Sequence, residues 1–117
     1  MSETDVLRPT LLLSRGGVRL WRNNNGVLQD KFGNFIQFGL APGSADCIGF
    51  KSILITEEMI GKRIAQFVSI ETKSPTGKTN KKRLETQTNW RNMVIEHGGI
   101  AGFSRSVEES KALLGVE

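Results

Sequence analysis

Between residues 18 and 73 the chain contains several short stretches in which apolar and polar side chains alternate. Alternation with a period of two is typical of strands that are buried on one face. The pattern predicts strands at 18–22, 34–40, 45–55 and 63–73, the third of them as two short extended pieces. The longest and most β-like of these stretches, 63–73, is predicted to be the central strand.

Segments that favour turns separate the predicted strands. NNNG at 23–26 and APGS at 41–44 are rich in residues that accept turn geometries. Residues 56–61 predict a charged connection with room for one helical turn, and residues 74–83 predict a loop with Pro, Gly and several basic side chains.

The C-terminal part changes to a period of three to four residues, which predicts helices. A helix at 84–97 places these side chains on one side: Leu84, Gln87, Trp90, Arg91 and Val94. Gly98 and Gly99 supply its stop. We expect a strand at 100–106 to follow it.

Two shorter helices complete the expected fold. A helix at 107–114 begins at a capping box, with Ser106 as N-cap and Glu109 at the third helical position. A helix at 6–14 is predicted with Pro9 near its first turn, where proline is tolerated. The order α-β-β-β-β-α-β-α predicts an α/β fold, a mixed sheet flanked by helices.

Composition and charge narrow the classes of function. The chain has 117 residues, which suits a single domain, and its formal net charge is +4. A basic balance favours polyanionic partners such as nucleic acid. No stretch predicts a signal peptide or a membrane span, and we expect a cytoplasmic protein without a membrane partner.

Cysteine and histidine are scarce. Cys47 is the single cysteine and His97 the single histidine, which excludes a disulfide framework and a zinc site made by the protein alone. Both are interpreted as structural. GKT at 77–79 resembles part of a phosphate-binding loop, but position 72 is Thr where that loop needs Gly, so no nucleotide cofactor is predicted.

Candidate chemistry begins on the predicted strand 63–73. Glu71 and Lys73 lie two residues apart and share one face. Such a pair is more often a surface ion pair than half of an active site. Asp46, however, follows a Pro-Gly turn at the start of another predicted strand, so two strands can present Asp46 and Glu71 side by side. Two carboxylates with a backbone carbonyl suit Mg²⁺, which can activate water for attack on a phosphate.

Two further residues fit this chemistry. Lys73 could steer or deprotonate the attacking water. Gln87 lies on the apolar side of its helix, where a buried amide needs partners. Two interpretations of Gln87 fit the sequence equally well. It is either a residue at the margin of the apolar stripe or a group that orders the water or the scissile phosphate.

Several motifs in order resemble the virus-type replication-repair nuclease (VRR-NUC) domains of the PD-(D/E)XK superfamily. They are WRNNNG (21–26), PGSADCIG (42–49), IETKSPTG (70–77), QTNW (87–90) and GGIAGFSRS (98–106). The stretch ITEEMIGKRIAQFVSIETKSPTG is similar to the stand-alone phage and prophage versions. The resemblance spans residues 3–110, nearly the whole chain.

The resemblance implies one restriction-endonuclease-like nuclease domain over residues 1–117, with Mg²⁺ or Mn²⁺ as cofactor. Asp46 and Glu71 would be the metal carboxylates and the Thr72 carbonyl a third ligand. Lys73 would be the catalytic lysine and Gln87 the family's motif glutamine. Glu3 is the nearest candidate for the acidic residue that relatives add from the first helix.

The expected partner is DNA. Basic side chains and one amide near the predicted site would contact phosphates without reading sequence: Arg22, Asn23, Lys78, Lys81, Lys82, Arg83 and Arg105. Stand-alone members of the family resemble junction resolvases, which implies a homodimer that cuts branched DNA such as a four-way junction. The alternatives are an idle DNA-binding module of the same fold, a nuclease for flaps, nicks or RNA, and a basic structural protein.

Overall fold

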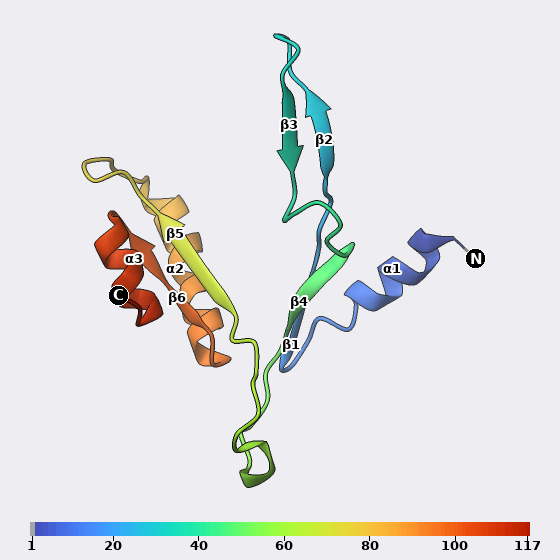
Figure 1. Cartoon of the computed structure of the whole chain (residues 1–117), viewed down its shortest axis with the longest axis vertical. Coiled ribbons are helices and arrows are strands. Elements are labelled where there is room, and N and C mark those ends of the chain that lie inside the picture. The colour runs from blue at the N-terminus through green and yellow to red at the C-terminus, as the bar shows by residue number, and fades with distance from the viewer. Residues whose placement is uncertain (1) are drawn as a thin grey trace. The chain divides into compact units, whose positions relative to one another are not determined.

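The computed structural model describes residues 2–117, and the chain divides into two units, 1–53 and 54–117. The helices are α1 (Glu3–Leu11), α2 (Lys81–Glu96) and α3 (Val107–Leu114), with a short 3₁₀ turn, η1 (Glu57–Met59). The strands are β1 (Val18–Arg22), β2 (Gly26–Gln29), β3 (Phe35–Phe38), β4 (Cys47–Lys51), β5 (Val68–Thr72) and β6 (Ile100–Ser104) (Figure 1). The described chain is therefore a mixed α/β structure.

Unit 1 contains α1 and two antiparallel strand pairs. β1 pairs with β4 and places Leu20 opposite Gly49. A Cβ at Gly49 would lie 1.8 Å from the carbonyl oxygen of Arg19, so a side chain at this position would collide with the backbone of β1. β2 pairs with β3 and places Leu28 opposite Ile36.

Asp30 holds the turn of the β2–β3 hairpin together. Its Oδ1 accepts hydrogen bonds of 2.9 Å from the backbone N–H groups of Phe32 and Asn34. Gly33 has a φ of +85°, which favours glycine. The bond from the Asn34 N–H is the main reason why the pKa of Asp30 lies below its ordinary value of 3.8.

Unit 2 is built on the parallel pair β5–β6. Parallel neighbours need a long crossover, and α2 supplies it. Both α2 and α3 pack against this pair (Figure 1). Its core contains Val94, which is 1% exposed, and Ala101, which is 7% exposed.

The two faces of β6 meet different helices. A Cβ at Gly102 would lie 2.6 Å from Leu113 of α3, so position 102 faces α3. The neighbouring positions Ala101 and Phe103 face the other way, because side chains alternate along a strand. Phe103 is opposite Glu71 in the register, so Glu71 lies on the α2 side of the pair.

Most predicted elements are confirmed, but α2 begins at Lys81 rather than at residue 84, and two details of α1 are corrected. β1 and α3 have the predicted bounds, and η1 falls within 56–61. α1 begins at Glu3 rather than at residue 6, because Ser2 and Asp5 form a capping box. Pro9 therefore lies near the end of α1 and not in its first turn.

The strand prediction is wrong in two respects. β2 was missed, so five strands rather than four precede α2. The predicted central strand 63–73 is shorter, Val68–Thr72, and within the described residues it pairs with β6 alone. Instead of one mixed sheet, the strands of residues 2–117 form three separate two-stranded sheets.

The structural roles predicted for the end of α2 and for Cys47 agree with the fold. His97 is the C-cap residue of α2, and Cys47 is a half-buried thiol at the start of β4. Among residues 2–117 no helix combines the length and apolar character that crossing a membrane requires.

Candidate active site

Three polar side chains of the predicted site lie together at the end of β5. Nε2 of Gln87 donates to Oε1 of Glu71 over 2.7 Å, and Oε1 of Gln87 accepts a hydrogen bond from Nζ of Lys73. Lys73 Nζ also lies 3.8 Å from Oε1 of Glu71. The sequence did not decide whether Gln87 lies at the edge of the apolar stripe or takes part in the site. In the structure its side chain is hydrogen-bonded to both charged groups.

Burial differs sharply between the two charges. The side chain of Lys73 is 11% exposed, whereas that of Glu71 is 45% exposed. Lys73 also donates to Oγ1 of Thr79 over 2.9 Å. An ammonium has three donors, and within residues 2–117 two of them go to Gln87 and Thr79. The third can serve a water or a phosphate oxygen at the open side, where Glu71 lies.

The strand ladder fixes the direction of Lys73. β5 ends at Thr72, but the backbone N–H of Lys73 donates to the carbonyl of Ser104 over 2.8 Å. The pairing with β6 therefore continues one residue beyond the strand. Because alternation is kept to this point, Glu71 and Lys73 share the face that meets α2.

Arg105 braces the loop that follows Lys73. Its Nη1 donates to the carbonyls of Ser74 and Gly77, the second over 3.3 Å. The Gly77 N–H in turn donates to Oγ of Ser74 over 2.6 Å. This loop carries Thr79, so Arg105 supports the partner of Lys73. Its predicted contact with DNA stays a prediction.

The start of α2 concentrates positive charge. Lys81, Lys82 and Arg83 occupy the first turn, which contains no acidic residue. The N-cap Asn80 accepts a hydrogen bond of 2.8 Å from the Arg83 N–H. Cations at this end oppose the helix dipole and destabilise the helix unless an anion lies nearby.

An open pocket of about 290 Å³ lies beside this helix start. Glu71 and Lys73 form part of its wall, and Lys78 and Arg83 line it as well. Four residues of the predicted site thus surround one space. Its wall combines a carboxylate that could bind a cation with basic side chains that could bind an anion.

Asp46 is presented by a turn that Asn23 organises. Nδ2 of Asn23 donates to Oγ of Ser44 over 2.7 Å and to the carbonyl of Ala45 over 2.9 Å. Its Oδ1 accepts from the Leu40 N–H over 3.0 Å. The backbone N–H of Asn23 donates to the carbonyl of Asp46 over 2.7 Å. Asn23, predicted to contact nucleic acid, therefore shapes the backbone that carries Asp46.

The predicted site residues fall into the two units. Unit 2 holds Glu71, Thr72, Lys73 and Gln87, and unit 1 holds the exposed Asp46. The pairing of Asp46 with Glu71 stays a prediction. The remaining predicted contacts of unit 1 are Arg22, at the end of β1, and Asn23; Glu3 lies in the first turn of α1.

The donor set has the chemistry of a hard cation site. Within residues 2–117 no group of three or more His, Cys, Asp or Glu side chains could hold a metal ion. The predicted donors are instead two carboxylates and one backbone carbonyl, all of them hard oxygens that suit Mg²⁺ or Mn²⁺.

Sequence reasoning missed Thr79 and the aromatic surroundings of the cluster. Thr79 lies in the GKT segment, which was weighed only as a phosphate loop. Phe103 lies opposite Glu71, and its ring centroid is 5.5 Å from Lys73 Nζ. A strand-register argument from Glu71 to the predicted strand 100–106 could have found Phe103, whereas no sequence signal links Thr79 to Lys73.

No profile of a known family, no curated protein and no solved structure matches this chain. The chemistry of the candidate site therefore rests on the contacts of its own side chains.

Proposed function

We propose that this chain is a metal-dependent endonuclease that hydrolyses phosphodiester bonds in DNA, of the VRR-NUC type within the PD-(D/E)XK superfamily. The observation that carries the proposal is the hydrogen-bonded cluster of Glu71, Gln87 and Lys73. In it an amide holds a half-exposed carboxylate and a nearly buried ammonium side by side.

The three side chains divide the work of hydrolysis. Glu71, with Asp46 and the carbonyl of Thr72, would hold the divalent cation, which when bound polarises a phosphoryl oxygen and lowers the pKa of a water. Lys73 offers its remaining N–H to the attacking water or to the charge that develops on the phosphate.

Gln87 is the orienting group. Its carbonyl oxygen faces the ammonium, and its NH₂ faces the carboxylate. Because an amide has one acceptor end and one donor end, this arrangement fixes which way each charged group points. Thr79 and the loop braced by Arg105 hold the ammonium from the other side.

The positive start of α2 supports a polyanionic substrate. Lys81, Lys82 and Arg83 destabilise the helix through its dipole, and a DNA phosphate would relieve that cost. Contacts of this kind carry no sequence information, so substrate choice would follow the structure of the DNA rather than its sequence.

The proposed fold is the restriction-endonuclease-like one, as a single domain over 1–117. The parallel β5–β6 pair with α2 as its crossover supports this fold, because it positions Glu71, Lys73 and Gln87 on neighbouring elements.

A homodimer is the proposed assembly, and the β2–β3 hairpin supports it. Leu28 and Ile36 face each other across the hairpin on one side and are 61% and 50% exposed. A two-stranded hairpin with an open apolar face is marginal in water, and exposed apolar patches mark interaction sites. Two active sites in a symmetric pair would also make the two cuts that a four-way junction needs.

The test is cleavage of labelled substrates with Mg²⁺, with Mn²⁺ and with EDTA. The panel comprises a four-way junction, a flap, a nicked duplex, an intact duplex, a single strand and an RNA duplex. We expect cleavage only with a metal, fastest on the junction, and its loss in Asp46→Asn with DNA binding retained. Binding without cleavage under every condition would identify an idle binding module and contradict the proposal.

A further inference from the structure

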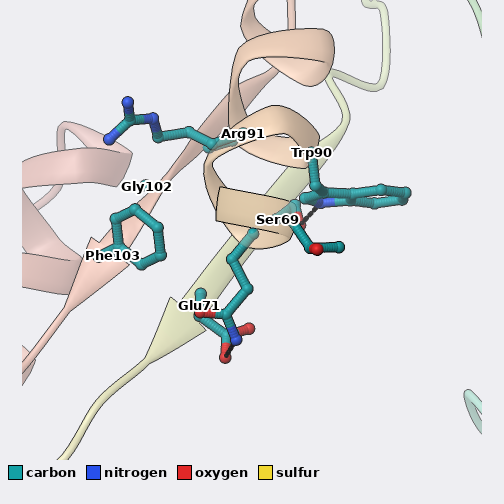
Figure 2. Close-up of a pocket in the computed structure, with 9 residues that line it drawn as sticks. Ser69, Glu71, Trp90, Arg91, Gly102 and Phe103 are labelled. Carbon is teal, nitrogen blue, oxygen red and sulfur yellow. Dashed lines mark hydrogen bonds between the residues drawn. The ribbon is translucent and has the colours of Figure 1, made fainter. Parts of the chain in front are cut away.

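A second pocket, of about 240 Å³, lies between α2 and the β5–β6 pair. Figure 2 shows Trp90 on one side of α2, and Arg91 and Phe103 on the other, with Ser69 and Glu71 contributed by β5. Its walls are mainly apolar and aromatic. Glu71 and Gln87 of the proposed catalytic cluster also line it, whereas Trp90, Arg91 and Phe103 have no part in the metal chemistry or the phosphate contacts proposed above.

One hydrogen bond ties the Trp90 ring to β5. The indole Nε1–H donates to Oγ of Ser69 over 2.7 Å. The residue is nevertheless 37% exposed. An aromatic ring whose polar end is anchored while part of its surface remains open can stack on another flat group without losing rotamer freedom.

The opposite side of the pocket is bordered by cations. The ring centroid of Phe103 lies 5.4 Å from the guanidinium carbon of Arg91 and 5.5 Å from Nζ of Lys73. The wall surface is thus mainly apolar, and at its border the cation of Arg91 and the carboxylate of Glu71 line the pocket, with Lys73 close to the Phe103 ring. This combination suits a ligand that joins an aromatic face to a negative charge.

The aromatic pocket adjoins the pocket of about 290 Å³ at the start of α2. Glu71 lines both pockets. It lies with Trp90 and Phe103 in the aromatic pocket, and with Lys78 and Arg83 in the pocket at the start of α2. A nucleotide has the same two parts, a flat base and an anionic phosphate linked by a sugar. The two pockets therefore match one nucleotide and the phosphate beside it.

We propose that the aromatic pocket binds one unpaired nucleobase of the DNA strand held at Glu71, stacked on Trp90. The inference rests on the proposed nuclease function, and it names the feature of DNA that the site selects. A base inside a regular duplex is stacked on its neighbours and cannot enter, whereas a base at a branch point or in a single strand is free to do so. Stacking on an aromatic side chain accepts any base, so the preference is for structure and not for sequence.

Tryptophan fluorescence can test this binding directly, because the chain has two tryptophans. Trp21→Phe leaves Trp90 as the single emitter, and Trp90→Phe leaves Trp21, which lies in β1 near Phe50. Each variant is titrated with a short oligothymidine in EDTA, so that nothing is cleaved. The same titration is repeated with an oligomer of equal length that has abasic sugars in place of the thymidines.

We expect the thymidine oligomer to quench Trp90 and the abasic oligomer, although bound through its phosphates, to leave its emission unchanged. Trp21 should respond to neither. Trp90→Ala should weaken binding of the thymidine oligomer about tenfold, as expected for one lost stacking contact, and should leave binding of the abasic oligomer unchanged. Trp90→Phe should restore most of that affinity, since it keeps an aromatic ring.

Equal quenching by both oligomers would overturn the proposal. So would a Trp90→Ala variant whose affinity falls by the same factor for the thymidine oligomer and for the abasic oligomer. A change of Trp90 emission with protein concentration alone would assign the pocket to a second copy of the chain, and would also overturn it. If Trp90→Ala does not fold, quenching of the Trp21→Phe variant by the two oligomers still tests whether a base binds at Trp90.

The outcome is separable from that of the proposed function. Metal-dependent cleavage of a junction without base-dependent quenching would leave the nuclease proposal intact and reject the pocket. Base-dependent quenching without cleavage under any metal would support the pocket and reject the nuclease.

Discussion

Neutralising Lys81 and Lys82 should make the free protein more stable and its complex with DNA weaker. Both side chains are exposed in the first turn of the 16-residue helix α2, which contains no acidic residue in that turn. Glutamine is the replacement of choice, because its helix propensity is close to that of lysine. The double variant Lys81→Gln/Lys82→Gln therefore changes charge and little else.

The magnitude follows from the position of the two charges. A charge in the first helical turn contributes roughly 0.3–1 kcal/mol through the helix dipole, so removing two unfavourable ones should stabilise the fold by about 0.6–2 kcal/mol at low salt. For a chain of this size that corresponds to a rise in Tm of about 2–8 °C. Two lost phosphate contacts should lower the slope of log K against log[salt] by about 1.8.

The assays are thermal denaturation followed by circular dichroism and binding of a labelled junction between about 50 and 200 mM salt. Lys111→Gln is the matched control. Lys111 lies in the last turn of α3, where a cation suits the helix dipole, and its Nζ is 3.7 Å from Oε1 of Glu108. Its neutralisation should lower Tm slightly and leave the salt slope unchanged.

Two results would refute this reasoning. A Tm that rises equally in the double variant and in Lys111→Gln would show that lower net charge, not the helix dipole, stabilises the protein. An unchanged salt slope in the double variant would remove the start of α2 from the DNA interface.

Three further predictions concern the amide, the hairpin face and the hairpin turn. Gln87→Met should lower the single-turnover cleavage rate about 10–100-fold, the usual effect of losing a group that orients a metal ligand, and DNA affinity measured in EDTA should not change; a rate within twofold of wild type would count against Gln87 as an orienting residue. Leu28→Glu should convert the proposed dimer to monomers in sedimentation velocity, whereas Gln37→Glu, on the opposite face of the hairpin, should not; equal sedimentation of the two variants would exclude this face as the interface. Asp30 should titrate below 3.8 by carbon NMR of its carboxyl group, so that its stabilisation of the turn is present above pH 3.8 and is lost as the pH falls through the lowered pKa; a midpoint at or above 3.8 would contradict the turn geometry.

Local patterns were enough to predict part of the cluster at the end of β5. Alternation along the strand places Glu71 and Lys73 on one face, and the helical period places Gln87 on the apolar side of its helix, but neither pattern decides whether Gln87 meets the two charged groups. Ser106 likewise marks the start of α3, since its Oγ accepts from the Glu109 N–H over 3.1 Å. These relations extend over a few residues, and backbone geometry alone determines them.

Other features could not be predicted because they depend on contacts between distant residues. Arg105 and Ser74 are 31 positions apart, and Asn23 and Ser44 are 21 apart, so nothing in either segment indicates the hydrogen bond. β2 has the sequence GVLQ, in which the two apolar side chains Val27 and Leu28 are adjacent, so no alternation marks it as a strand. The early start of α1 was predictable in principle, because Ser2 and Asp5 have the spacing of a capping box.

The most direct test of the proposed active site is the rate of Mg²⁺-dependent cleavage of a labelled four-way junction by Lys73→Ala. Replacing this ammonium removes the hydrogen bonds to Gln87 and Thr79, and circular dichroism with junction binding in EDTA would verify that the variant folds and still holds its substrate. We predict a rate at least about 100-fold below that of wild type, the loss expected when a group that handles a proton or stabilises the transition state is removed. A folded Lys73→Ala variant that cleaves the junction as fast as the wild-type protein would contradict the proposed active site.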